Sequence, residues 1–159
     1  MKRLRSESQP LDITDVQILL ALAVDARTSV ADLARMVSLS PPTVSERIRR
    51  LEEAGVIEGY AATINPKALG LPISAWLRVR PTPGQHYKVA DILRGRPEIV
   101  SCDRITGEDC FLARAHARSV EDLERLIDAI TPFAMTNTSI VQSSPVPNRI
   151  PPIPSVKAG

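Results

Sequence analysis

Apolar side chains in the first third of the chain recur every three or four residues, which predicts amphipathic helices. Val44, Ile48 and Leu51 stand at positions i, i+4 and i+7, so residues 40–54 are predicted to form a helix with one buried face. A shorter helical pattern over residues 30–37 precedes it across a tight turn. Two helices joined in this way predict a helix-turn-helix, whose second helix can enter the major groove of DNA.

Capping residues flank both of these helices. Ser40 can accept a hydrogen bond from a free N–H group of the first turn, and Pro41 suits the first helical position because no N–H is needed there. Gly55 is expected to end the second helix in a left-handed conformation. Ser29 or Thr28 is expected to cap the shorter helix.

A third helical pattern begins at Asp12 and Asp15 and completes a small helical core. The side chains expected on its buried face are Val16, Leu19, Leu20 and Ala23. In the shorter helix, the side chains expected to face inward are Leu33, Ala34 and Val37.

Positive charge in this part of the chain is local. Residues 1–65 hold eight Lys/Arg against nine Asp/Glu. The basic residues gather in two places, the N-terminal arm with Lys2, Arg3 and Arg5, and the second helix with Arg47, Arg49 and Arg50. Ordinary solvated arginines are the alternative interpretation. DNA affinity depends on which phosphates are met rather than on a domain's total charge, so the pattern favours nucleic-acid binding.

The segment over residues 56–64 is apolar and strand-like, with an interruption at Gly59. Two short strands here would form a wing beside the helices, and a connector to the next domain is the alternative.

From residue 73 the apolar pattern changes to the alternation typical of strands. The order of predicted elements is strand, helix, strand, strand, helix, strand, over residues 73–80, 87–93, 99–106, 110–117, 120–130 and 136–141. Ser119 is expected to cap the second of these helices. This order is the ferredoxin-like split βαβ arrangement, so the whole chain is predicted to be an α+β protein.

Two helices would cover only one face of such a sheet. The large apolar residues considered for the other face are Trp76, Ile105, Phe111 and Leu112. A bare apolar face predicts self-association. The proline-rich segment 144–159 cannot continue regular structure and is expected to be an extended or disordered arm.

Composition fits a soluble globular protein, with 43% hydrophobic and 24% charged residues. No apolar stretch approaches the roughly 20 residues of a membrane helix. The N-terminus lacks the apolar core of a secretory signal, so we expect a cytoplasmic protein.

The two cysteines lack neighbours at metal-ligand spacing, so neither a metal nor a cofactor is predicted. In a hairpin turning at 106–109, Cys110 would lie opposite Ile105 and Cys102 opposite Ala113, too far apart to bridge. Catalysis by Cys102 or Cys110 with His116 is the rival function. It is disfavoured because His116 would lie about 20 Å from Cys110 on the same strand, at about 3.3 Å per residue, whereas a catalytic base must lie within hydrogen-bond reach of the sulfur. No catalytic residue is therefore assigned. His86 is expected at the surface.

Taken together, the chain resembles the Lrp/AsnC family of bacterial and archaeal transcription regulators. The segments that carry the resemblance are LDITDVQILLALAVDART at 11–28, LARMVSLSPPTVSERIRRLEEAGVIEGYAATINPKALG at 33–70, RITGEDCFLARAHA at 104–117 and TNTSIVQ at 136–142. The resemblance implies a winged helix-turn-helix domain over residues 1–62, a linker over 63–72 and a ligand-sensing, oligomerising RAM-type domain over 73–143. It also implies dimers that assemble into tetramers, octamers or larger forms, with small effectors such as amino acids bound between dimers.

Site residues are carried over from the family's motifs. The DNA-binding positions that the resemblance implies are Ser40, Pro42, Thr43, Ser45, Glu46, Arg47, Arg49 and Arg50. The effector-binding positions that it implies are Thr106, Gly107, Glu108, Asp109, Thr136 and Thr138. Many members carry an acidic residue where Cys110 stands, and here the carboxylate is one position earlier, at Asp109.

The expected mechanism is binding of double-stranded DNA by a dimer, with half-sites about 34–36 Å apart. Arg47 and Arg49 are expected to meet phosphates, while Arg50 and Glu46 reach base edges. A sequence-tolerant architectural protein that compacts DNA without an effector is the alternative function.

Overall fold

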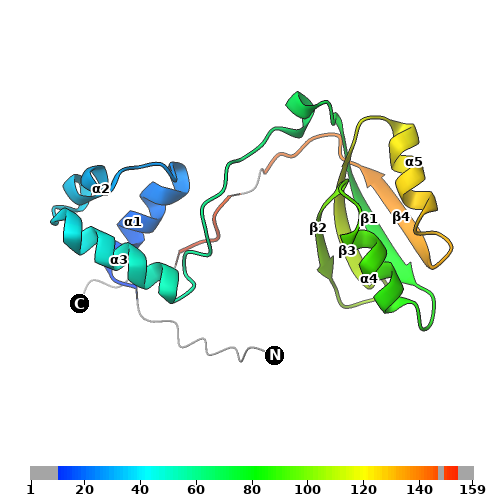
Figure 1. The fold of residues 1–159 in the computed structure, drawn as a ribbon, viewed down its shortest axis with the longest axis horizontal. Helices are drawn as coiled ribbons and strands as arrows, with labels where there is room; N and C mark the ends of the chain where they lie inside the picture. The colour runs from blue at the N-terminus through cyan, green and yellow to red at the C-terminus, as the bar shows by residue number, and fades with distance from the viewer. Residues whose placement is uncertain (1–10, 147–148, 154–159) are drawn as a thin grey trace. The chain divides into compact units, whose positions relative to one another are not determined.

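The computed structural model of this chain describes residues 11–146 and 149–153. The chain divides into two compact units: the second is Ile64–Pro147, and the first is Met1–Thr63 together with the C-terminal segment Asn148–Gly159. Helices make up the regular structure of the first unit, and a sheet with two helices makes up most of the second (Figure 1). No helix formed by the described residues is long and apolar enough to span a membrane.

Three helices form the first unit: α1 (Ile13–Val24), α2 (Val30–Val37) and α3 (Pro41–Glu53). The predicted caps are confirmed, since Ser29 accepts from the N–H of Asp32 and Ser40 accepts from the N–H of Thr43. Gly55, just past the C-terminal end of α3, has the predicted left-handed backbone with φ 69°. The helix-turn-helix over α2 and α3 is therefore present.

The turn between α2 and α3 is closed by backbone contacts. Ser38 adopts the left-handed conformation with φ 56° and ψ 41°, the only described non-glycine residue with positive φ. The next residue, Leu39, donates its N–H to the carbonyl of Ala34 at 3.0 Å and packs against the helical core. This geometry lets the chain reverse direction within a few residues.

The core of the first unit contains Ile18, Leu33, Ala34 and Val44, all buried. The predicted buried face of α1 was wrong at two positions, because Leu20 is 46% exposed and Ala23 is exposed as well, while Val16 and Leu19 are half-buried. The inward positions of α1 are instead Asp15, Ile18, Ala21 and Leu22. Asp15 is the cause of the error, since a charged residue occupies the first position of the buried face and hides its apolar pattern.

Residues 56–64 form no strand. The predicted β wing is therefore not formed, and the connector alternative describes this segment. Its start is held to the end of α3, because the N–H groups of Val56 and Ile57 both donate to the carbonyl of Leu51. Further along, Tyr60 donates its hydroxyl to Glu52 at 2.8 Å.

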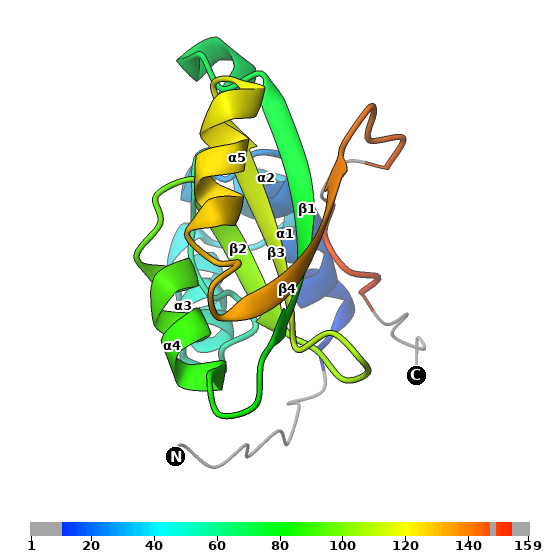
Figure 2. The ribbon, with the colours of Figure 1, turned by 90° about the vertical axis from the view of Figure 1, so that its right-hand side faces the viewer.

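The second unit starts with a short 3-10 helix, η1 (Pro66–Leu69). The elements that follow it are β1 (Ile73–Pro81), α4 (His86–Arg94), β2 (Ile99–Arg104), β3 (Phe111–Ala117), α5 (Val120–Asp128) and β4 (Ala134–Ile140). The strands form one antiparallel sheet in the order β2-β3-β1-β4, which confirms the ferredoxin-like topology. Both helices lie on the same side of the sheet (Figure 2).

Alternation along β1 and β3 separates the two faces of the sheet. Leu77 and Val79 point into the core beneath the helices, as do Val89 of α4 and Leu126 of α5. Phe111 belongs to this core and is only 7% exposed.

Of the large apolar residues predicted for the other face, Phe111 was wrong, and Ile105 lies directly after β2, outside the strands. Phe111 pairs with Val79 in the β1–β3 register, and directly paired residues share a face of the sheet. Trp76 and Leu112 do lie on the side without helices. We call this side the uncovered face, and among its residues are Trp76, Arg78, Leu112, Arg114 and Asn137.

The cysteine register is as predicted, with Cys102 paired to Ala113 and Ile105 bonded to Cys110, and both thiols are free. The described parts of the proline-rich segment, 144–146 and 149–153, form no helix or strand. The basic N-terminal arm lies outside the described residues.

Candidate DNA-binding helix and effector turn

The first turn of α3 is exposed and capped by its own hydroxyl groups. The Ser40 hydroxyl accepts from the Thr43 N–H at 3.4 Å, and the two hydroxyl oxygens lie 2.7 Å apart. Pro42 beside them is exposed and brings no N–H donor. This end of the helix carries the positive end of the helix dipole, which attracts anions such as a phosphate group.

The outer row of α3 continues from Pro42 through Ser45, Glu46 and Arg49, all exposed. Arg49 is paired on its own helix, donating from Nε to Glu46 at 2.9 Å and from Nη1 to Glu53. The hydrogen bond from Arg49 lowers the pKa of Glu46, and the same contact raises the pKa of Arg49 above its ordinary value. A phosphate or base must therefore compete with two carboxylates for this guanidinium.

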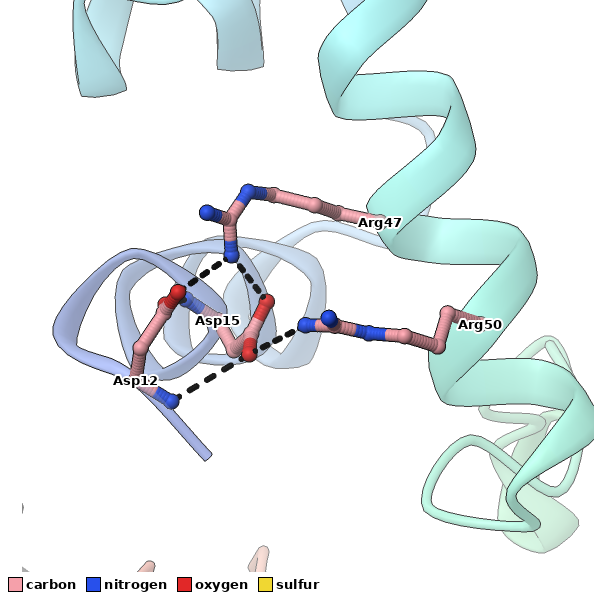
Figure 3. Close-up of polar contacts among 4 residues, drawn as sticks. All are labelled: Asp12, Asp15, Arg47 and Arg50. Carbon is pink, nitrogen blue, oxygen red and sulfur yellow. Dashed lines mark hydrogen bonds and ion pairs between the residues drawn. The ribbon is translucent and has the colours of Figure 1, made fainter. Parts of the chain in front are cut away.

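Arg47 and Arg50 leave α3 on a different side and reach α1 (Figure 3). Arg47 Nη1 lies 2.6 Å from Oδ2 of Asp12 and 2.8 Å from Oδ1 of Asp15. Arg50 Nη2 lies 2.8 Å from Oδ2 of Asp15. We call these four residues the α1–α3 ion cluster.

The ion cluster also caps α1. Asp12 accepts from the N–H of Asp15 at 2.8 Å, and Asp15 accepts from the N–H of Asp12 at 3.2 Å, which forms a capping box. Asp15 is only 1% exposed, yet two guanidinium groups and one N–H satisfy its carboxylate. Two negative and two positive charges balance, as a buried charge requires.

Protonation in the cluster follows from these contacts. Partial desolvation pushes the pKa of Asp12 upward, but the Asp15 N–H and the Arg47 guanidinium outweigh it, so the pKa lies below its usual value. Hydrogen bonds to Asp12 and then to Asp15 raise the pKa of Arg47. Asp12 and Arg47 are therefore both charged near neutral pH.

The structure separates the sequence-predicted DNA-binding residues into two groups. Six of them are exposed without a contact to α1: Ser40, Pro42, Thr43, Ser45, Glu46 and Arg49. Arg47 has only 23% of its side chain exposed, and Arg50 has 47%. Sequence reasoning treated Asp12 and Asp15 as the start of a helix and missed their contact with the arginines, although two carboxylates facing two arginines was a signal.

The predicted effector turn lies at the tip of the β2–β3 hairpin. Gly107 has φ 113°, a backbone conformation that residues other than glycine rarely adopt. Beside it, Glu108 reaches across to β1 and pairs with Arg80 at 2.5 Å. The carboxylate of Glu108 is thus engaged on the neighbouring strand, while remaining largely exposed.

The predicted threonines lie on β4, across β1 from the turn. Thr136 pairs with Val79 and Thr138 with Leu77, so both face the helix-covered side of the sheet. Val79 of β1 lies between the turn and the threonines. It pairs with Thr136, and its carbonyl accepts from the N–H of Cys110, directly after the turn, at 3.0 Å. The Thr138 hydroxyl is buried and has no hydrogen-bond partner among the described residues.

The environment of His86 differs from the predicted one. His116 pairs with Ser74 toward the far end of β3, whereas His86, expected at the surface, is half-buried with its Nε2 3.4 Å from the Sγ of Cys110. Among the described residues no group of three or more His, Cys, Asp or Glu side chains could hold a metal ion.

Two family models match the chain. Residues 11–58 match a winged helix-turn-helix DNA-binding model, and residues 74–151 match the Lrp/AsnC ligand binding domain. The HTH-type transcriptional regulator LrpC of Bacillus subtilis is 35% identical over 133 residues, covering 84% of this chain and 92% of the relative.

Solved structures agree with this assignment. The structure of Bacillus subtilis LrpC has a TM-score of 0.81 at 34% identity and covers 86% of this chain and 97% of LrpC. The feast or famine regulatory protein of M. tuberculosis, complexed with L-methionine, has a TM-score of 0.81 at 32% identity, covering 89% of this chain and 98% of that protein. With these matches and the fold described above, the chain belongs to the Lrp/AsnC family of DNA-binding transcriptional regulators.

Proposed function

We propose that this regulator binds specific DNA sites as a dimer, with α3 of each protomer in the major groove. The observation that carries the proposal is the exposed outer row of α3, which starts at a capped positive helix end and contains Ser45, Glu46 and Arg49. This row offers hydroxyl, carboxylate and guanidinium groups of the kinds that read base edges. As a DNA-binding regulator and not an enzyme, the protein would act in the cytoplasm.

The residues of α3 would divide the work between them. Arg49 would exchange its carboxylate partners for a phosphate, and Arg50, with one amino group on Asp15, would offer the rest of its guanidinium to a base edge. Ser40, Pro42 and Thr43 would approach the backbone at the helix end. Arg47 would position α3, because its Nη1 is already shared between Asp12 and Asp15.

Gel shifts on a specific and a scrambled site test the role of Arg50. Arg50→Ala should lose about 1–3 kcal/mol of discrimination, the usual value of a bidentate contact between arginine and a base. Arg49→Ala should weaken binding to both sites alike. Equal loss of Arg50→Ala on the two sites would place Arg50 on the DNA backbone instead.

A small effector, such as an amino acid, would bind near the turn Thr106–Asp109 and the β4 threonines, at contacts between dimers. The complex of a relative with L-methionine supports this proposal. An effector shifts the assembly only if it prefers one form over another. Calorimetry with the common amino acids, combined with light scattering, tests it; binding of none of them would favour an effector-independent architectural protein.

A further inference from the structure

Cys110 and His86 form a side-chain pair that DNA binding does not use. His86 is the first residue of α4 and Cys110 directly precedes β3, and their Nε2 and Sγ atoms lie 3.4 Å apart. The backbone of Cys110 is fixed on both sides, since its N–H donates to Val79 and its carbonyl accepts from Ile105, each at 3.0 Å. The sulfur is therefore held beside the imidazole by the sheet.

A thiol beside an imidazole has a defined chemistry. When Nε2 carries the lone pair, it can accept the thiol proton while the sulfur attacks an electrophile, which makes the sulfur a stronger nucleophile. A metal centre is a poorer match, because this pair has no third ligand among the described residues. The geometry points to a reactive thiol.

Cys102 supplies the contrast within the same chain. It is exposed and lines a groove between α4 and β2, whereas Cys110 is half-buried. Desolvation in that groove, and then the charge of Asp103, raises the pKa of the Cys102 thiol and keeps it protonated. If exposure alone decided the rate, Cys102 would be the more reactive thiol. Because an imidazole lies beside its sulfur, Cys110 is expected to react faster instead.

We propose that Cys110 is an oxidation site for hydroperoxides, with His86 as its general base. The sulfur attacks the nearer peroxide oxygen, an S–O bond forms and the O–O bond breaks. The thiol proton passes through His86 Nε2 to the leaving oxygen, so the thiol and hydrogen peroxide give a sulfenic acid and water. The sulfur is oxidised and the peroxide is reduced.

The site lies directly beside the proposed effector turn. Oxidation would add an oxygen atom to a sulfur that is half-buried beside His86, where the start of α4 contacts the end of the β2–β3 hairpin. The backbone hydrogen bonds of Cys110 hold the end of the turn to β1 and to Ile105. Oxidation of the Cys110 side chain should therefore shift the backbone directly after Asp109. The thiol chemistry itself does not depend on the proposed DNA binding.

Alkylation kinetics on the full-length protein test the proposal. Iodoacetamide at neutral pH, followed by peptide mass spectrometry, gives the rate at each cysteine. Cys110 should react about tenfold faster than Cys102, a modest effect beside the roughly 10²–10⁴ of positioned bases in active sites. His86→Asn should bring Cys110 down to the rate of Cys102, and the matched control His116→Asn should leave both rates unchanged.

Sulfenic acid trapping gives the second readout. After hydrogen peroxide treatment, dimedone should label Cys110 in the wild-type protein and in Cys102→Ser. Faster reaction at Cys102, equal labelling of the two cysteines, or a Cys110 rate unaffected by His86→Asn would overturn the proposal. If His86→Asn does not fold, the alkylation rates of Cys110 and Cys102 in the wild-type protein still test the proposal.

Discussion

Asp15 is a charged residue in the interior of the first unit, and its carboxylate depends on Arg47 and Arg50 for compensation. Removing one partner of such a pair leaves a charge without its counterpart, which destabilises a protein more than the pair itself stabilises it. The ion cluster is therefore a point where a single substitution affects both the stability of the first unit and the position of α3.

Asp15→Asn should lower the free energy of unfolding of the first unit by about 2–3 kcal/mol, less than the roughly 3–5 kcal/mol of a fully buried pair because both arginines keep some exposure. Urea denaturation measures this. Asp32→Asn is the matched control, since Asp32 pairs with Arg35 on an exposed surface, and its loss should stay below about 1 kcal/mol. Similar losses for the two variants would contradict a special role of the cluster.

The lowered pKa of Asp12 makes part of this stability depend on pH. A carboxyl group with a lower pKa in the folded state stabilises it above the ordinary pKa of 3.8, and this contribution is lost as pH falls through the folded value. Asp12→Asn should therefore be less stable than wild type near neutral pH, and the difference should vanish in acid. Thermal melts of both proteins from neutral to acid pH measure this difference in stability. A difference that grows as pH falls would contradict a lowered pKa of Asp12.

Sequence reasoning found the residues of the site more readily than their contacts. The exposed row of α3 follows from helical periodicity, because Val44 and Leu51 fix which side is buried. The contact between Arg47 and Asp12 could not be predicted in this way, because the residues lie 35 positions apart and only the packing of α1 against α3 brings them together.

At the scale of elements, the turn between α2 and α3 holds Ser38 in a left-handed conformation. A β-branched side chain is strongly disfavoured there, while glycine adopts this conformation freely. Ser38→Val should destabilise the first unit by about 1–2 kcal/mol, the usual penalty of this conformation. Ser38→Gly should not destabilise it. Thermal unfolding of the two variants tests this, and equal stability would show that the turn can adjust.

The elements that the sequence predicted well are those with a strong period and a clear cap. The four strands and both helices of the second unit were found, because alternation along β1 and β3 and the cap at Ser119 mark them. The 56–64 segment was ambiguous, because a short apolar run fits a strand or a connector equally well. Phe111 was misplaced because the face of a strand depends on its register with its neighbour.

At the scale of the whole molecule, the uncovered face of the sheet is where we expect two protomers to pair. Arg114 stacks over the Trp76 ring at 5.2 Å from its centre, beside Leu112. A tryptophan and an arginine together are typical of the central residues of protein interfaces.

Leu112→Glu should weaken the dimer at least about 100-fold, because a two-fold interface would bury two unpaired charges. Tyr87→Glu, on the exposed side of α4, is the matched control and should leave the dimer intact. Light scattering and sedimentation measure the assembly. A Leu112→Glu variant that stays dimeric would show that the dimer forms through another surface.

The pairing of the α3 arginines also governs how binding responds to salt. Affinity falls with salt because neutralised phosphates release their counterions, with a slope of about −0.9 for each phosphate. Arg47 stays paired with Asp12 and Asp15 and is assigned no phosphate, so Arg47→Ala should leave this slope unchanged even where a shifted α3 lowers the affinity. Arg49, which is proposed to exchange its carboxylates for a phosphate, should make the slope shallower by about 0.9 per protomer when it is replaced by Ala. Affinities measured across a salt series test both expectations, and a shallower slope for Arg47→Ala would contradict the first. Because Arg47 pairs with carboxylates of its own domain, α3 contributes fewer phosphate contacts than its three arginines suggest. Binding to a specific site should therefore persist at salt concentrations that dissociate proteins with more phosphate contacts.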